Sequence, residues 1–138
     1  MPTAQAAFSS LGLAEDLVGA VLQAGYNAPT DIQTHGIPAF LGGRDVVFQA
    51  QTGTGKTAAF VLPILQQLTA SPGRVEALVL TPTRELAHQV CEEFARFGAD
   101  RGVNATAIYG GVAFQRQYDA LETAQVVVAT PGRLLDLI

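Results

Sequence analysis

Several residue types are scarce in this chain, and each scarcity excludes a class of protein. The single cysteine, Cys91, cannot form an internal disulfide, and with only His35 and His88 beside it the sequence has no zinc-ligand spacing. The longest apolar run, 58–65, is interrupted by Pro63, and roughly 20 residues are needed to cross a bilayer. No leader of basic and then apolar residues opens the chain. We therefore expect a cytoplasmic protein without a membrane partner.

Charge is also scarce, at 14% of the 138 residues, whereas soluble domains average about 25%. This leaves little charge for a free surface, so we expect more protein to cover part of it. The net charge of −4 disfavours a protein that coats nucleic acid broadly, but it permits a local basic patch. Among the 8 basic residues, Lys56 is the one lysine.

The apolar pattern predicts strands that alternate with helices. Short strands are predicted at 46–48, 75–80, 103–108 and 126–129, the last covered on both faces because it is uniformly apolar. Helices are predicted near 13–22, 31–42, 56–68, 86–97, 115–121 and from 131 onward. This alternation indicates a parallel sheet in an α/β fold. The last helix ends on apolar residues without a polar cap, which favours a truncated chain over a natural terminus.

A phosphate-binding loop is predicted between the first strand and the helix that begins at Lys56. Residues 50–57, AQTGTGKT, fit the P-loop pattern with alanine in place of the first glycine. Glycines let backbone N–H groups converge on phosphate oxygens, and the helix N-terminus adds positive potential. Lys56 would contact the β and γ phosphates, while the Thr57 hydroxyl can ligate Mg²⁺. The alternative is a glycine-rich connection that carries a surface lysine.

Further motifs follow in order: Phe8, GYNAPTDIQ at 25–33, PTRELA at 82–87, Gly110-Gly111 and TPGR at 130–133. Together with the P-loop they resemble the N-terminal RecA-like domain of DEAD-box RNA helicases, over essentially the whole chain. The resemblance implies an α/β fold with a parallel sheet flanked by helices, a RecA-like P-loop NTPase that is incomplete. It further implies one partial domain, 1–138, with a Q-motif region at 1–33 and a P-loop core at 44–138.

The resemblance implies ATP and Mg²⁺ as cofactors. Gln33 would read adenine through its amide, and Phe8 would stack on the adenine ring. The alternative for Gln33 is a helix capping box with Thr30, a role that can coexist with adenine reading, and the alternative for Phe8 is a hydrophobic anchor. Lys56 and Thr57 would be the catalytic residues, with Thr57 reaching Mg²⁺ through the nucleotide. The implied nucleotide-binding set is Phe8, Tyr26, Thr30, Gln33, Gln51, Thr52, Gly53, Thr54, Gly55, Lys56 and Thr57, in which Tyr26 replaces the commoner phenylalanine.

The same resemblance implies a track of contacts to the RNA backbone. Backbone N–H groups, close-approaching glycines and guanidinium groups suit phosphate contacts. Ordinary turn and cap chemistry is the alternative, with Thr130 as an N-cap and Pro131 at the first helical position. The implied RNA-binding residues are Pro82, Thr83, Arg84, Gly110, Gly111, Thr130, Pro131, Gly132 and Arg133.

The chain departs from the family in what it lacks. The motifs Asp-Glu-Ala-Asp and Ser-Ala-Thr and a second RecA-like domain are absent. The resemblance implies that the strands bearing these two motifs lie beside the strand predicted at 46–48, so their loss would leave that strand at an open edge of the sheet. The missing remainder of the helicase core would then be a required partner. We expect the ATP- and RNA-binding part of a DEAD-box RNA helicase, itself inactive in ATP hydrolysis and unwinding. The alternatives are another adenine-specific P-loop NTPase and a non-enzymatic module in which ATP only sets affinity.

Overall fold

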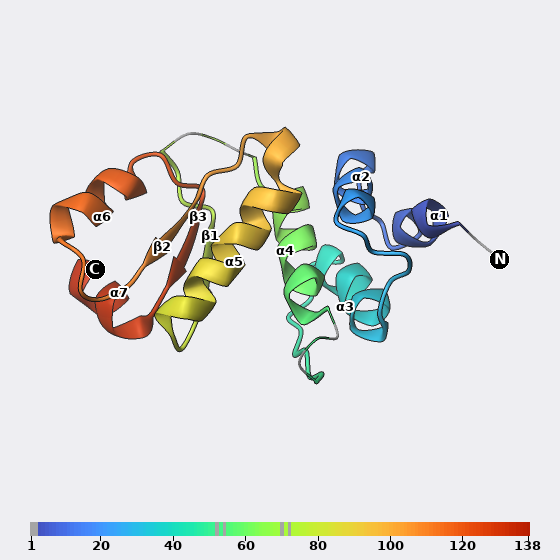
Figure 1. Ribbon diagram of the computed structural model, residues 1–138, viewed down its shortest axis with the longest axis horizontal. Coiled ribbons are helices and arrows are strands. Elements are labelled where there is room, and N and C mark those ends of the chain that lie inside the picture. The colour runs from blue at the N-terminus through green and yellow to red at the C-terminus, as the bar shows by residue number, and fades with distance from the viewer. Residues whose placement is uncertain (1–2, 52, 54, 70, 72) are drawn as a thin grey trace. The chain divides into compact units, whose positions relative to one another are not determined.

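Helices open the chain, and strands enter in its second half (Figure 1). The computed structural model describes residues 3–51, 53, 55–69, 71 and 73–138. The elements are α1 (Ala4–Ser9), α2 (Glu15–Gln23), α3 (Asp31–Leu41), α4 (Lys56–Gln67), β1 (Ala77–Leu80), α5 (Arg84–Phe97), the 3₁₀ helix η1 (Ala99–Arg101), β2 (Ala105–Ile108), α6 (Phe114–Leu121), β3 (Val126–Ala129) and α7 (Pro131–Leu137). The chain forms two units, 1–67 and 68–138, a division that falls inside the segment 44–138 expected to be one core.

The first unit is built from α1 to α4. The predicted helices are confirmed, and α1 is an addition, capped by the Thr3 hydroxyl, which accepts a hydrogen bond from the Ala6 amide at 3.1 Å. The Gln66 side chain of α4 holds the link between α1 and α2, because it accepts from the Ala14 amide and donates to the Gly12 carbonyl, both at 2.7 Å. The buried apolar side chains of this unit include Phe8, Leu17, Val18, Val21, Ile37, Val61, Leu62 and Leu65.

The strand predicted at 46–48 is wrong for this structure. Residues 44–50 are irregular, and the Val47 side chain is 95% exposed. A strand needs a neighbour for its backbone hydrogen bonds, and the sheet found among the described residues pairs only β1, β2 and β3. Phe48 is held by α3 instead, where a β-carbon added to Gly36 would come within 2.6 Å of the Phe48 ring.

The second unit contains a parallel sheet in the order β1-β3-β2, which confirms the predicted fold class. The strand predicted at 126–129 is confirmed and all its residues are buried, while β1 and β2 each start two residues later than predicted. Helix α5 packs against β2 and β3, and α6 and α7 cover the opposite face (Figure 1). On that face Leu121, Leu134 and Leu137 pack against Ile108, Val127 and Ala129.

One apolar part of the sheet stays uncovered. Leu78 and Leu80 pair in register with Val127 and Ala129 and so share their face, yet they are 53% and 56% exposed. Exposed apolar surface of this kind supports the expectation that more protein covers part of this chain. Within the described residues, no helix combines the length and the apolar character that a membrane crossing needs.

Candidate nucleotide and nucleic-acid sites

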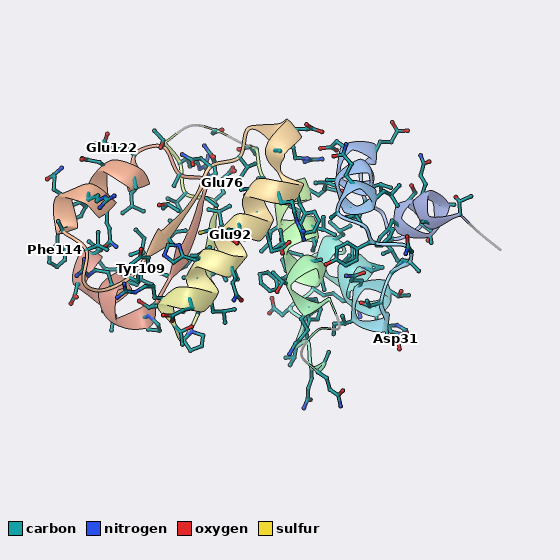
Figure 2. The ribbon with its side chains drawn as sticks, viewed as in Figure 1. Asp31, Glu76, Glu92, Tyr109, Phe114 and Glu122 are labelled. Atoms are coloured by element: carbon teal, nitrogen blue, oxygen red, sulfur yellow. The ribbon has the colours of Figure 1, made fainter. Side chains whose placement is uncertain are left out.

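A cavity of about 600 Å³ lies in the first unit, between the start of α3 and the residues that lead into the P-loop. Cavities that bind small molecules commonly measure roughly 300–1,000 Å³. Asp31, at the beginning of α3, is one of its lining residues (Figure 2). The lining residues are Thr30, Asp31, Ile32, His35, Gln49, Ala50 and Gly53.

Two glycines of the P-loop take the left-handed backbone conformation. Gly53 and Gly55 have φ angles of 82° and 83°, which side-chain-bearing residues rarely adopt. The predicted helix start at Lys56 is confirmed, so Lys56 and Thr57 occupy the first two positions of α4, both half-buried. The backbone amides at the N-terminus of this helix are suited to an anion. Thr52 and Thr54, also predicted to bind nucleotide, lie outside the described residues.

Gln33 connects α3 to the P-loop. Its side-chain oxygen accepts from the Thr30 amide at 3.0 Å, and the Thr30 hydroxyl accepts from the Gln33 amide at 3.4 Å, which confirms the capping box. The Gln33 side-chain nitrogen donates to the Gly55 carbonyl at 3.3 Å. The side chain is fully buried, and a β-carbon at Gly55 would stand only 2.4 Å from its nitrogen. Adenine reading by Gln33 stays a prediction, because both the oxygen and the nitrogen of its side-chain amide form hydrogen bonds within the protein here.

Phe8, Tyr26 and Gln51 differ in how they could reach a nucleotide. The Phe8 ring in α1 is fully buried, which agrees with a hydrophobic anchor and leaves no ring face open for stacking on adenine. Tyr26 is half-buried in the segment that follows α2, and Gln51 is exposed. A stacking role for Phe8 therefore requires a conformation other than this one.

The sequence reasoning missed Asp31 and His35 as cavity residues. Both line the cavity from α3, and their spacing of four residues puts them on one helical face. The spacing shows only that the two residues share a helical face, and it does not indicate that this face lines a cavity. Among the described residues no group of three His, Cys, Asp or Glu side chains could hold a metal ion.

The motifs predicted to bind RNA meet at one edge of the second unit. Residues 82–84 follow β1, 110–111 follow β2 and 130–133 follow β3. Because the strands are parallel, their carboxyl ends lie at the same end of the sheet, which we call the carboxyl edge, and ligands bind there in open α/β folds. Pro82, Thr83, Arg84, Gly110, Gly111, Pro131 and Gly132 are exposed, and Thr130 is half-buried.

Helices α5 and α7 both begin here, but their N-termini are capped differently. The Thr83 hydroxyl caps α5 by accepting from the Leu86 amide at 3.2 Å, and Arg84 follows as the first helical residue. Thr130 as the N-cap and Pro131 at the start of α7 are both confirmed, but the Thr130 hydroxyl makes no capping hydrogen bond. The Thr130 carbonyl instead accepts from the Leu134 amide at 3.2 Å, so the backbone alone begins this helix.

Arg133 is the predicted RNA contact that points into the protein. Its side chain is 10% exposed, and its guanidinium lies over the ring of Phe114 at 4.4 Å (Phe114 is labelled in Figure 2). One guanidinium nitrogen donates to the Val112 carbonyl at 2.6 Å and to the Gln117 side chain at 3.0 Å. The Gln117 amide in turn donates to the Tyr109 carbonyl at 2.8 Å. Arg133 and Gln117 therefore pin both ends of the turn that carries the two glycines.

Cys91 takes no part in either site. Burial, with a smaller contribution from the Glu92 carboxylate, raises the pKa of its thiol to about 11. The thiol therefore stays protonated at neutral pH and is a poor nucleophile.

Comparison with known proteins agrees with this geometry. The family model described as DEAD/DEAH box helicase matches residues 30–138. The chain is 49% identical over 132 residues to the DEAD-box ATP-dependent RNA helicase CshA of Streptococcus pneumoniae, with 95% of this chain and 25% of the relative covered. It is 48% identical over 130 residues to the probable ATP-dependent RNA helicase DDX47 of Homo sapiens, with 94% and 29% covered. The chain thus spans about a quarter of the length of the curated relatives that it matches.

Solved structures show the same fold. A DEAD box protein from Methanococcus jannaschii superposes with a TM-score of 0.89 at 43% identity, covering 94% of this chain and 36% of that one. Dbp5 of S. cerevisiae, solved bound to RNA and ADP BeF3, superposes with a TM-score of 0.85 at 34% identity, covering 95% and 33%.

Replacing Gln33 tests whether its amide holds the P-loop in the absence of nucleotide. We expect Gln33→Leu to lower the free energy of unfolding by about 1–3 kcal/mol, because the Thr30 amide and the Gly55 carbonyl lose their partner. Urea denaturation of the nucleotide-free protein, followed by circular dichroism, measures the change. Gln23→Leu, at an exposed position in α2, is the control, with a change within about 0.5 kcal/mol. Wild-type stability of Gln33→Leu would favour a role in adenine reading alone.

A conservative change at Arg133 tests whether its hydrogen bonds, and not only its positive charge, hold the turn at 109–112. Arg133→Lys keeps the positive charge but cannot reproduce the planar fork of donors. We expect faster amide hydrogen exchange at 109–112 and a loss of about 1–3 kcal/mol in unfolding free energy. Arg116→Lys, exposed on α6, should change neither quantity. Unchanged exchange in Arg133→Lys would show that the turn holds without the guanidinium.

Proposed function

Because the chain belongs to the DEAD/DEAH box helicase family, we propose that it is the ATP- and RNA-binding part of an ATP-dependent RNA helicase. The observation that carries this proposal is the P-loop, with two left-handed glycines, Lys56 at a helix start and a cavity alongside. A cytoplasmic location, expected from the sequence, is part of the same proposal.

ATP would bind in the first unit, with its phosphates at the P-loop. Lys56 places a positive charge at the start of α4, where the helix N-terminus already favours an anion. The Thr57 hydroxyl is an oxygen donor of the kind that Mg²⁺ prefers, and the phosphates would supply further oxygens. Bound Mg²⁺ would neutralise phosphate charge. The cavity at the start of α3 would take the remainder of the nucleotide.

RNA would bind along the carboxyl edge of the sheet in the second unit. The exposed Thr83–Arg84 helix start and the Gly110–Gly111 turn offer backbone amides, close approach and one guanidinium at that edge. These groups suit phosphates and carry no base-reading pattern, so binding would be independent of sequence. The fold shared with Dbp5, whose solved structure is bound to RNA and ADP BeF3, supports this proposal.

The proposal separates binding from turnover. The sequence contains no Asp-Glu-Ala-Asp, and in the resemblance these carboxylates hold Mg²⁺ through water and position the attacking water. This chain spans about a quarter of the length of its curated relatives, and we propose the remainder of the helicase core as its partner. Hydrolysis and unwinding would belong to the assembled protein.

A single substitution at Lys56 tests the nucleotide site. We expect Lys56→Met to weaken ATP binding by at least about tenfold, the equivalent of one charge-assisted contact. Titration with a fluorescent ATP analogue, with and without single-stranded RNA, measures the affinities. Arg96→Met, at an exposed cation of α5, is the control and should bind as the wild type does. RNA binding that ignores nucleotide, combined with no ATP binding, would overturn the proposed function for this chain.

The isolated chain should bind ATP without turning it over. We expect phosphate release at the uncatalysed background rate, because few groups remain to stabilise the transition-state charge. Release of labelled phosphate, with and without RNA, measures this directly. Turnover by residues 1–138 that matches a full-length homologue would contradict the prediction.

A further inference from the structure

Tyr109 lies among the proposed RNA-binding segments, directly after the outer strand β2, although no motif includes it. It follows the last residue of β2 and precedes Gly110 (Figure 2). Its carbonyl accepts from the Gln117 side chain at 2.8 Å, and its hydroxyl shares a hydrogen bond of 2.9 Å with His88 of α5. The two rings also meet edge to face at 5.0 Å. Backbone and side chain of Tyr109 are therefore both fixed by neighbouring helices.

The fixed ring of Tyr109 supports Arg84. The Arg84 guanidinium carbon lies 5.0 Å from the centre of the Tyr109 ring, which is cation–π distance. A β-carbon added to Gly111 would stand 3.7 Å from a guanidinium nitrogen of Arg84. The guanidinium therefore lies beside both the ring and the glycine turn. Arg84 and His88 are one helical turn apart on α5, so α5 supplies both the cation and the residue that holds the ring.

We propose that Tyr109 is a positioning residue that holds the Arg84 guanidinium in place for an RNA phosphate. This inference rests on the proposed function of the edge. An exposed arginine otherwise loses much side-chain freedom when it binds. A ring that orders the guanidinium before RNA arrives reduces that loss, while the exposed face of Arg84 stays open to phosphate. Arg133, in contrast, has its guanidinium engaged by the turn itself.

The test is a double-mutant cycle on the whole chain, read by anisotropy of a fluorescein-labelled oligouridylate in the presence of ATP and Mg²⁺. Tyr109→Leu should weaken RNA binding by about two- to fivefold, the equivalent of one exposed cation–π contact. The same substitution should cause no further loss in an Arg84→Ala background. Arg84→Ala alone should reduce the slope of log affinity against log salt by about 0.7, as expected when one phosphate contact with a single strand is lost.

Two further variants separate positioning from a structural role. Tyr109→Phe keeps the ring under Arg84 and its edge-to-face contact with His88, and loses only the hydroxyl hydrogen bond. It should therefore lose less RNA affinity than Tyr109→Leu does. Tyr118→Leu, at an exposed tyrosine of α6, is the matched control and should leave binding unchanged. An equal loss from Tyr109→Leu with and without Arg84 would overturn the proposal, because that result would mean the ring only supports the turn.

The contact can also be observed without RNA. The δ protons of Arg84 should show an upfield ring-current shift in the free chain, kept in Tyr109→Phe and lost in Tyr109→Leu. Absence of this shift in the wild type would overturn the positioning role. A normal shift in a wild-type chain that binds no oligouridylate would instead show that the proposed function has failed, and the RNA role of Tyr109 with it.

Discussion

Parallel pairing of β3 with a strand on each side is the constraint on which the second unit depends. The pairing aligns the ends of all three strands, since Leu80 and Ile108 both lie opposite Ala129. Segments that are distant in sequence then leave the sheet at the same edge and in the same direction. Their loops need little structure of their own to meet, because the register has already brought them together. All four residues of β3 are buried, so the strand that aligns the other two is also the best-covered strand of the sheet.

In the first unit a side-chain hydrogen bond provides the corresponding link. The Gln33 amide joins the capped start of α3 to the carbonyl of Gly55, directly before α4 begins. A strand preceding a P-loop normally anchors it, but residues 44–50 are irregular here. The buried Gln33 side-chain amide and the packing of Phe48 against Gly36 therefore help to position the P-loop, a task that a paired strand would otherwise perform.

The sequence predicted most of what depends on local pattern. Strand 126–129, the start of α4 and the capping box at Thr30 are confirmed because apolar runs, the P-loop glycines and cap residues act over a few positions. The strand at 46–48 was wrong because a strand also needs a partner, which an apolar triplet cannot reveal. Pocket residues such as His35 were missed for a similar reason, since only the fold shows which side of α3 faces the cavity.

The two predicted RNA-contact arginines show why residue type alone does not assign a role. Each lies in the first turn of a helix at the same sheet edge, and each has an aromatic ring within 5.0 Å of its guanidinium. Arg84 remains exposed, and its described ring contact leaves its donors available. The Arg133 side chain is only 10% exposed; one of its guanidinium nitrogens is engaged by a carbonyl and a side-chain amide, and its Nε is buried without a hydrogen-bond partner. Binding an anion therefore needs accessible donors as well as charge, and the exposure of each arginine decides which of the two can supply them.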